Sequence, residues 1–416
     1  SVERTVDKVQ RDLVIPAELG TLLDSIDDAL TTLEASGYSD DLLPKNALPK
    51  KVPAELFSYW DSVATAREEY RESVKFSFSC DTRTIPAADV VSTLKRMILH
   101  VDQGLTRAMK VGSGGDGDDG STGVAPSYFS YNATSWEPTG EMDGTGMPYV
   151  DITGISVGTF PLFLEGPVRM MKTLPQKDGE TENLEVYENV KSSGLYDKEL
   201  NSYTVSASLV GQSYDMGRMM AFSPGWLENQ SVWTHMSYKF YLQLLRAGLS
   251  SVFFKELKGG AMLPFVDFKT YGRSLLECSS FVASSAFPDS NQHGRGFLAR
   301  LSGSTAEFLS IWVLMFVGKQ PFEVDPISTE LTMTFRPTLP DWVFDDQGTV
   351  GFKLFSEIHV TYINEKGGDL VDTLPKKFEV SYKHHDGKDV VEEDRLPEYI
   401  ADQARRLDVK SIKVWF

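Results

Sequence analysis

Apolar residues recur at helical spacing in the first part of the chain and predict a series of amphipathic helices. In residues 17–35, leucine and isoleucine return every three or four positions and mark one face. Residues 54–75 and 87–110 repeat this spacing, and the latter carry the longer apolar stripe. We also expect residues 155–173 to be helical, with a break at an internal Gly-Pro pair.

A second helical block surrounds the stretch 223–254, SPGWLENQSVWTHMSYKFYLQLLRAGLSSVFF. It begins with a Ser-Pro-Gly turn. Trp, Glu, Asn, Thr and His side chains follow within ten residues, and an apolar helix is predicted after them. Residues 302–317 are apolar on almost every side after a hydroxyl-rich start, which is typical of a deeply buried helix. We therefore expect two buried helices with polar residues at their beginnings.

The pattern changes after Gly318. Apolar and polar residues then alternate, with β-branched and aromatic side chains between Pro, Gly and Asp turns. The predicted strands are 329–336, 350–363, 376–383 and 410–416, with a short helix at 398–407. The fold class expected is mainly α with a C-terminal β region. Residues 1–318 would form part of an (α/α)6 toroid whose remaining helices lie upstream, and residues 319–416 a β-sandwich or jelly-roll-like domain.

Two polar segments interrupt the helical part and are interpreted as surface insertions. Residues 111–123 are dominated by Gly, Asp, Ser and Thr. A calcium loop needs an ordered ligand spacing with a closing Glu, and a phosphate loop needs a Lys before a helix; this segment has neither. Residues 174–195 are highly charged and are expected to form a loop. No metal site is predicted.

Charge and cysteine content restrict the classes of function. The chain of 416 residues carries 59 acidic against 41 basic side chains, a net charge of -18. Such a surface disfavours nucleic acid and anionic membranes as partners. No apolar run is long enough to span a bilayer. Two cysteines without metal-type spacing point to a reducing compartment, so we expect an intracellular, cytoplasmic protein, with an organelle as the alternative.

Two short motifs carry a resemblance to a known family. The first joins Trp226-Leu227-Glu228-Asn229 to Trp233-Thr234-His235, and the second is Arg300-Leu301-Ser302-Gly303-Ser304-Thr305. With the segment 163–172 and the terminal β region, they resemble the C-terminal part of cellobiose-phosphorylase-type inverting glycoside phosphorylases, nearest to the large members of unsettled substrate. The resemblance implies phosphorolysis of β-glucosidic oligosaccharides to α-glucose 1-phosphate, with inorganic phosphate as co-substrate and no cofactor.

The same resemblance suggests roles for individual residues. His235, Ser302 and the backbone N–H of Gly303 match phosphate-binding positions, and Arg300 is a nearby cation suited to phosphate. Glu228 matches a sugar-contacting position. The other residues expected to bind substrate are Trp226, Asn229 and Arg273. The alternatives are structural: a core histidine for His235, a helix cap for Ser302 and a helix-dipole partner for Glu228.

The catalytic residue remains unknown at this level. The family uses an upstream Asp as general acid, and Asp116 to Asp119, in a Gly-rich loop, are poor substitutes. The acid would therefore lie on an upstream segment or a companion chain, unless the chain is an inactive remnant. Two other functions stay open: a glycoside hydrolase with Glu228 as base, or a non-catalytic carbohydrate-binding or scaffold subunit. A homodimer is also kept as a candidate state.

Overall fold

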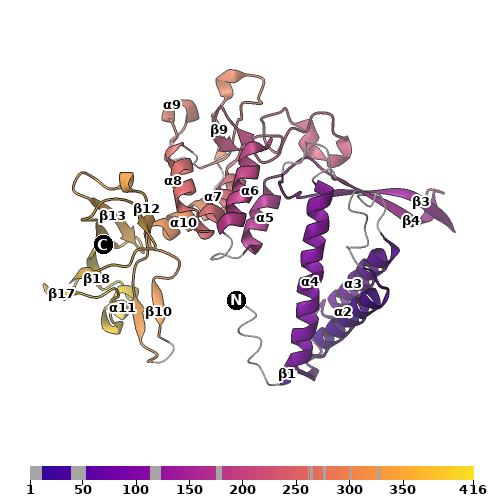
Figure 1. Cartoon of the computed structure of the whole chain (residues 1–416), viewed down its shortest axis with the longest axis horizontal. Helices are drawn as coiled ribbons and strands as arrows, with labels where there is room; N and C mark the ends of the chain where they lie inside the picture. The colour runs from indigo at the N-terminus through magenta and orange to yellow at the C-terminus, as the bar shows by residue number, and fades with distance from the viewer. Residues whose placement is uncertain are drawn as a thin grey trace. The chain divides into compact units, whose positions relative to one another are not determined.

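The computed structural model divides the chain into two compact units, Ser1–Gly166 and Pro167–Phe416. Figure 1 labels their helices and several of their strands. The residues that the structure describes are 12–38, 53–112, 123–174, 180–260, 262, 266–274, 278–299, 302–325 and 328–416. The domain boundary predicted after residue 318 lies inside the second unit, and most of the predicted insertion 111–123 lies outside the described residues.

Three helices build much of the first unit, and they confirm the periodicity of its sequence. They are α2 (Ala17–Ala35), α3 (Ala54–Ser73) and α4 (Ala87–Gly112). Helix α2 packs against both of the others. A proline immediately precedes each helix and fixes the extended backbone from which the helix begins. Strands β1 (Asp12–Pro16) and β2 (Thr82–Pro86) pair antiparallel and tie the starts of α2 and α4 together.

A long hairpin completes the first unit and corrects one prediction. Strands β3 (Phe129–Met142) and β4 (Pro148–Thr159) pair antiparallel, so the expected helix 155–173 is wrong in its first part. Ile155 and Val157 alternate with small residues, which is a strand period that a short apolar run conceals. Helix α5 (Glu165–Thr173) begins later. Its Gly-Pro pair causes no break because proline is tolerated in the first turn of a helix.

The second unit contains the two buried helices expected from the sequence. Helix α7 (Thr234–Arg246) packs against α10 (Ser302–Phe316). The helix predicted to continue to residue 254 ends at Arg246, because Gly248 has a φ of 80° and turns the chain. The chain resumes as α8 (Ser250–Lys258), and a short α9 (Phe268–Tyr271) follows.

The loop expected at 174–195 is wrong for most of its length, because residues 180–192 form helix α6 (Glu180–Ser192). Asn183, Val186, Tyr187 and Val190 are buried along one face of this helix. This face is narrow and is hidden in the sequence by many charged residues, whose solvated side chains cover the remaining surface. Residues 175–179 of the predicted loop lie outside the described residues.

Small sheets hold the helices of the second unit in place. Strands β7 (Val232–Trp233), β8 (Ser279–Val282) and β9 (Gly296–Ala299) form one antiparallel sheet, in which β7 leads directly into α7. Strands β5 (Tyr196–Asp197) and β6 (Ser202–Tyr203) pair with each other. Further two-stranded pairs join β10 (Phe322–Val324) to β11 (Leu331–Met333), and β12 (Thr338–Leu339) to β15 (Leu370–Val371).

The C-terminal region forms a five-stranded sheet in the order β13-β14-β18-β16-β17. Its strands are β13 (Thr349–Leu354), β14 (Ile358–Ile363), β16 (Lys377–Tyr382), β17 (Lys388–Val391) and β18 (Val409–Trp415). Strand β18 runs parallel to β14 and antiparallel to β16. Helix α11 (Glu398–Arg405) connects β17 to β18. The helix predicted at 398–407 and the strands predicted at 376–383 and 410–416 are confirmed. The segment predicted as one strand at 350–363 forms two, β13 and β14, and only residues 331–333 of the strand predicted at 329–336 are extended in a sheet, as β11.

The predicted fold class is nevertheless wrong. The structure is 40% helix and 26% strand, with ten helices and several small separate sheets among the described residues. This is a mixed α/β architecture and shows no α/α toroid. The C-terminal strands gather in one main sheet with a crossover helix, which is not the paired-sheet layout of a sandwich. Periodicity identified most helices correctly, but it carries no information on how helices associate.

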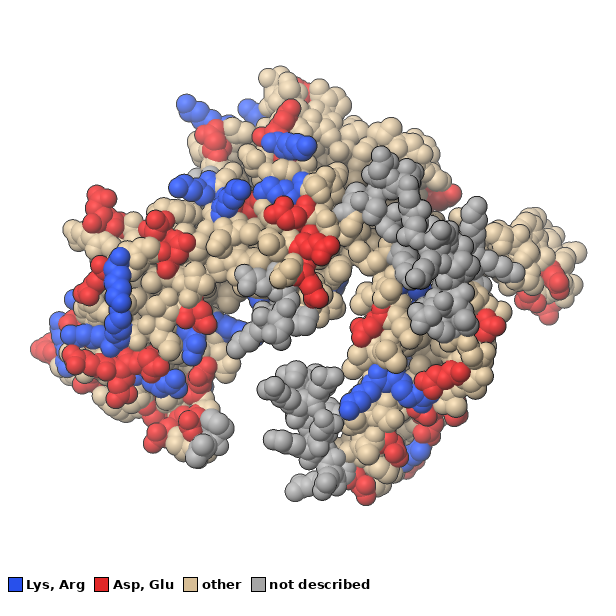
Figure 2. Space-filling view, viewed as in Figure 1, with Lys and Arg blue, Asp and Glu red and all other residues tan. Residues whose placement is uncertain are grey.

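Charged side chains of both signs are dispersed over the visible face in Figure 2, with acidic ones more frequent. This distribution agrees with a net charge that resides on the whole surface and not in one tail. Within the part of the chain that the structure describes, none of the helices combines the length and the apolarity required to cross a membrane.

Candidate functional site

The first turn of α7 is held in place by the sheet that precedes it. The hydroxyl of Thr234 donates to the carbonyl oxygens of Ser279, at 2.5 Å, and Ser280, at 3.2 Å. The ring of Trp233 stacks on Phe281 with centroids 6.1 Å apart. These contacts join the start of α7 to β8 and leave little freedom to the residue that follows.

His235 and Gly303, two residues predicted to bind phosphate, lie in direct contact. Each is the second residue of its helix, α7 for His235 and α10 for Gly303. A Cβ atom on Gly303 would lie 2.6 Å from Cγ and Cε1 of the imidazole and closer still to Nδ1. The Nε2 atom of His235 is 3.8 Å from the carboxylate of Glu307. Only glycine at position 303 therefore allows the ring to lie between the two helix starts.

The electrostatics of these helix starts favour an anion. Backbone N–H groups in the first turn of a helix lack intrahelical acceptors and carry a positive partial charge. Neither α7 nor α10 has an acidic residue in its first turn, and Trp233 at the N-cap of α7 provides no side-chain hydrogen bond. The His235 side chain is 37% exposed, so a ligand can reach it from solvent.

Several cations of α5 and α7 lie close enough together to affect the pKa of Lys172 on α5. The pKa of the Lys172 ammonium is lowered, first by partial burial and then by repulsion from other cations. Those cations are Arg169, Lys239 and Arg246. The carboxylate of Glu307 acts in the opposite direction. Lys239 lies one turn after His235 on α7 and therefore extends the positive face of the helix start.

Cys278 lies among hydroxyl groups from both helix starts. Burial raises the pKa of its thiol, and hydrogen bonds with Ser304, Thr305 and Thr234 act to lower it. Ser304 and Thr305 are the third and fourth residues of α10, and Thr234 is the first of α7. The thiol thus marks a second point, besides His235, at which the two helix starts approach each other.

The turn Trp226–Asn229 is closed by its own backbone and anchored by an aromatic cluster. The N–H groups of Trp226 and Asn229 each donate to the carbonyl of the other, at 3.2 and 3.1 Å. The Trp226 indole packs on Phe281, Phe287 and Phe297, with ring centroids 4.4 to 5.0 Å apart. This arrangement gives Trp226 a structural role in positioning the turn.

The polar residues of this turn have different environments. Glu228 forms a two-pronged ion pair with Arg218, in which Nε donates to Oε2 at 3.0 Å and Nη2 to Oε1. Asn229 is buried, and its Nδ2 donates to the carbonyl of Phe222 at 2.8 Å. Its Oδ1 atom is also buried and has no hydrogen-bond partner among the described residues. Since this oxygen is enclosed by the protein, it offers no acceptor at the surface.

Arg273, the fourth residue expected to bind substrate, is attached to the backbone of β9. Its Nε atom donates to the carbonyl oxygen of Gly296 at 2.6 Å. The next residue on that strand, Phe297, packs against Trp226. Arg273 and the turn therefore share β9 as support, and the hydrogen bond positions the guanidinium instead of leaving it in solvent.

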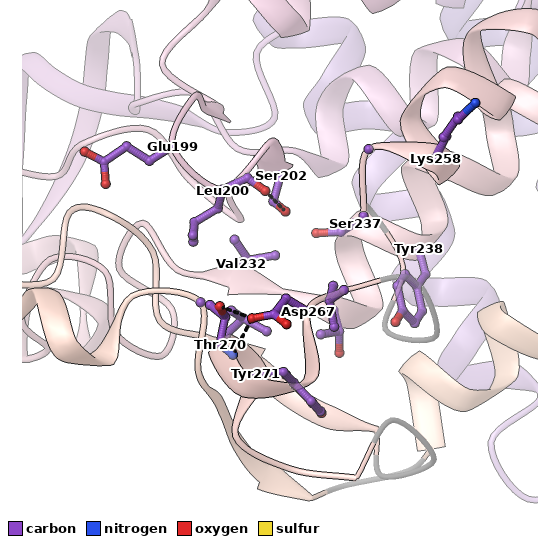
Figure 3. Close-up of a pocket in the computed structure, with 16 residues that line it drawn as sticks. Glu199, Leu200, Ser202, Val232, Ser237, Tyr238, Lys258, Asp267, Thr270 and Tyr271 are labelled. Carbon is purple, nitrogen blue, oxygen red and sulfur yellow. Dashed lines mark hydrogen bonds between the residues drawn. The ribbon is translucent and has the colours of Figure 1, made fainter.

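A pocket of about 270 Å³ opens beside the first turn of α7 (Figure 3). Thr234, Ser237 and Tyr238 line it from α7, with Asp267 and Thr270 opposite. The Asp267 carboxylate accepts from the N–H of Thr270 at 2.9 Å and from its hydroxyl at 2.7 Å, as Figure 3 shows. Hydroxyls, a carboxylate and aromatic rings are the groups with which proteins bind polar small molecules.

The structure places most of the predicted residues and leaves some unplaced. His235 meets Gly303, and Ser302 begins the same helix, although its side chain is not described. Arg300 and the acidic loop residues 116–119 lie outside the described residues. In the described part of the chain, no group of three or more His, Cys, Asp or Glu residues could hold a metal ion.

Sequence reasoning missed three groups near the helix starts. Lys239 could have been found, since it follows His235 by four residues on a predicted helix. Lys172 carried a weaker signal, as a charge in an otherwise apolar segment. Cys278 carried none, because only the fold brings it to Thr234 and Ser304. No family model matches this chain, and no curated protein matches it either.

Proposed function

We propose that this chain provides the phosphate-binding and sugar-binding part of an inverting glycoside phosphorylase that acts on β-glucosidic oligosaccharides. The observation that carries this proposal is the packing of His235 on Gly303 at the joined starts of α7 and α10. Backbone N–H groups at helix starts, an imidazole and nearby ammonium groups are a combination suited to a phosphate dianion. The cations Lys172 and Lys239 support it in a chain that is otherwise strongly acidic.

In the proposed reaction, an oxygen of inorganic phosphate attacks the anomeric carbon of the terminal glucose. The bond between that carbon and the glycosidic oxygen breaks, and a general acid donates a proton to the leaving oxygen. The products are α-glucose 1-phosphate and an oligosaccharide shorter by one glucose. His235 and the helix starts would hold and orient the attacking phosphate. We assign the general acid to an upstream segment or a companion chain.

The sugar would bind through the turn that precedes α7. Glu228, oriented by Arg218, can accept a hydrogen bond from a sugar hydroxyl. Asn229 supports the turn from within, because its side chain is buried and its Nδ2 atom donates to the carbonyl of Phe222. Since Arg218 contacts both oxygens of the Glu228 carboxylate, this residue is poorly suited to act as the base of a hydrolase.

The test measures the binding of phosphate to the full chain by ³¹P NMR line broadening or calorimetry. Gly303→Ala adds a methyl group that overlaps the imidazole ring of His235, so the ring must move. Phosphate binding should therefore weaken about tenfold or more. Gly351→Ala is the matched control, because its nearest neighbour would be 3.6 Å away. Equal phosphate affinity in all three proteins would refute the assignment of the anion site.

The reaction itself is tested with laminari- and cello-oligosaccharides in the protein that contains the general acid. Phosphate-dependent release of α-glucose 1-phosphate is the expected result. Release of reducing sugar without phosphate would instead indicate a hydrolase. Sugar binding without either product would indicate a non-catalytic carbohydrate-binding subunit.

A further inference from the structure

Helix α4 uses a polar face to contact its own unit. The hydroxyl of Thr93 donates to the carboxylate of Asp27 on α2 at 2.7 Å. Arg96 donates to the same carboxylate at 2.6 Å and to Glu34 at 2.9 Å. His100 lies edge-on to the ring of Tyr59, with centroids 4.4 Å apart. On this face of α4, charged, polar and imidazole side chains make the contacts with α2 and α3.

The apolar face of the same helix is exposed. The exposed fractions are 44% for Leu94, 55% for Ile98, 58% for Val101 and 46% for Leu105. Their separations of four, three and four residues place them in one stripe, which is the seam of a two-helix coiled coil. This stripe points away from the face that carries Thr93 and Arg96, because those residues occupy a different part of the helical wheel.

The stripe is long enough to bind another helix. Helix α4 has 26 residues, which gives it a length of about 39 Å. The exposed stripe from Leu94 to Leu105 covers about 17 Å of this length, and exposed apolar surfaces of this kind mark interaction sites. A membrane surface is a poor partner, because the chain has a net charge of -18 and anionic lipids would repel it.

We propose that this stripe is covered by the same helix of a second copy of the chain, in an antiparallel arrangement. In heptad terms, Ile98 and Leu105 occupy a positions, and Leu94 and Val101 occupy d positions. Antiparallel helices pair a with d, so Ile98 meets Val101 of the second copy, and Leu94 meets Leu105. A two-fold axis then passes between residues 98 and 101, which makes the contact self-complementary and closed.

Charge complementarity selects the antiparallel orientation. Lys95 and Asp102 both lie at e positions and both are exposed. In an antiparallel pair e positions face each other, so Lys95 of each copy lies beside Asp102 of the other. In a parallel pair these residues would face Val90 and Met97, which offer no charge. The antiparallel dimer thus places opposite charges side by side at two points where the parallel dimer does not.

The first test measures the mass of the full chain by sedimentation velocity at tens of micromolar protein. The wild-type chain should sediment as a dimer, and Ile98→Glu should sediment as a monomer with an unchanged circular dichroism spectrum. Val390→Glu, on strand β17, is the matched control because Val390 is also 55% exposed; this variant should remain dimeric. A monomeric wild-type chain, or loss of the dimer in both variants, would overturn the proposal.

The second test exchanges the charges. Lys95→Glu and Asp102→Lys each turn two attractive pairs into repulsive ones and should raise the dimer dissociation constant about tenfold. The double variant, and an equimolar mixture of the two single variants, should both recover the wild-type constant. Recovery in the mixture requires contact between copies, so its absence would exclude the antiparallel pairing.

The third test fixes the orientation with disulfides in a chain that carries Cys80→Ser and Cys278→Ser. A mixture of a Leu94→Cys variant and a Leu105→Cys variant should form a heterodimeric disulfide, since these positions meet across the axis. The Leu94→Cys variant alone should not cross-link. Efficient cross-linking of Leu94→Cys to itself would instead show a parallel dimer and refute the arrangement proposed.

Discussion

Helices α7 and α4 are both predicted by the same apolar spacing, yet they use it in opposite ways. On α7 the side chains of Phe240, Tyr241 and Leu244 are buried within the second unit. On α4 the equivalent stripe, represented by Ile98 and Val101, is exposed. Helix α7 is covered by α10 and a small sheet, whereas α4 turns Thr93 and Arg96 toward its neighbours. An apolar helix face is stable when another surface packs against it, but the sequence of the helix does not specify which surface that is.

The largest effect expected from this contrast is on stability. Phe240→Ala should lower the free energy of unfolding of the second unit by about 4 kcal/mol, because it removes a fully buried ring and leaves a cavity. Ile98→Ala, measured at a protein concentration where the chain is monomeric, should change it by no more than about 0.5 kcal/mol. Urea unfolding followed by tryptophan fluorescence compares them. Equal losses would show that α4 is covered within its own chain.

The second largest effect is expected when one acidic residue is removed from each unit and the losses of stability are compared. Glu256 on α8 is buried and accepts hydrogen bonds from Tyr187 at 2.6 Å, Tyr203 at 3.2 Å and Lys191. Glu256→Ala should cost about 3 kcal/mol, because it leaves the Lys191 ammonium without its partner in a half-buried position. Glu34→Ala, which removes an exposed partner of Arg96, should cost less than about 1 kcal/mol. Thermal unfolding of both variants measures the difference.

Alkaline pH should destabilise the second unit through this same cluster. Burial, reinforced by the hydrogen bond to Glu256, raises the pKa of Tyr187 to about 12. Burial acts to lower the pKa of Lys191, but its bonds to Glu256 and Tyr187 outweigh burial and raise it. Above the unfolded values of 10.0 and 10.5, the unfolded chain loses these protons first, so stability falls as pH rises.

Urea titrations at pH 8 to 11 measure this loss. Tyr187→Phe removes one of the titrating groups and should make the decline between pH 10 and 11 shallower than in the wild-type chain. The hydrogen bond from Arg96 on α4 to Glu34 raises the pKa of its guanidinium, so Arg96 keeps its proton throughout this range. A free energy of unfolding that stays constant up to pH 11 would contradict the prediction that the unfolded chain loses these protons first.

The smallest effect is expected at Arg218. This side chain is 80% exposed, so Arg218→Ala should change the free energy of unfolding by less than about 0.5 kcal/mol although it removes the ion pair with Glu228. Sugar affinity, in contrast, should fall if Arg218 orients Glu228 for substrate. Loss of stability without any loss of sugar affinity would assign the pair a purely structural role.

Local pattern was sufficient for many of the elements and failed where two periods compete. The three helices of the first unit and the start of α10 follow from residue spacing, capping residues and prolines. The segment around Ile155 was predicted as helix, because a short apolar run fits a strand as well as a helix. Helix α6 was missed since charged residues conceal the narrow face of Val186 and Val190. These failures arise in segments whose conformation is determined by the surface against which they pack and not by their own sequence pattern.

The candidate site divides in a similar way. The resemblance to inverting glycoside phosphorylases singled out His235 and Gly303, and the fold brings them into contact. Spacing could not reveal that Arg218 forms an ion pair with Glu228, that Oδ1 of Asn229 lacks a partner, or that Cys278 lies beside Thr234. Each of these depends on how distant segments meet, which no local pattern encodes.

By itself, the sequence determined the local elements: which segments have an apolar face, where prolines and glycines begin and end helices, and that the surface is strongly acidic. Only the tertiary structure decided that the helices form no toroid, that α7 is buried and that α4 exposes its apolar stripe. The physical reason is that propensity and periodicity act over a few residues, whereas burial depends on surfaces from distant parts of the chain.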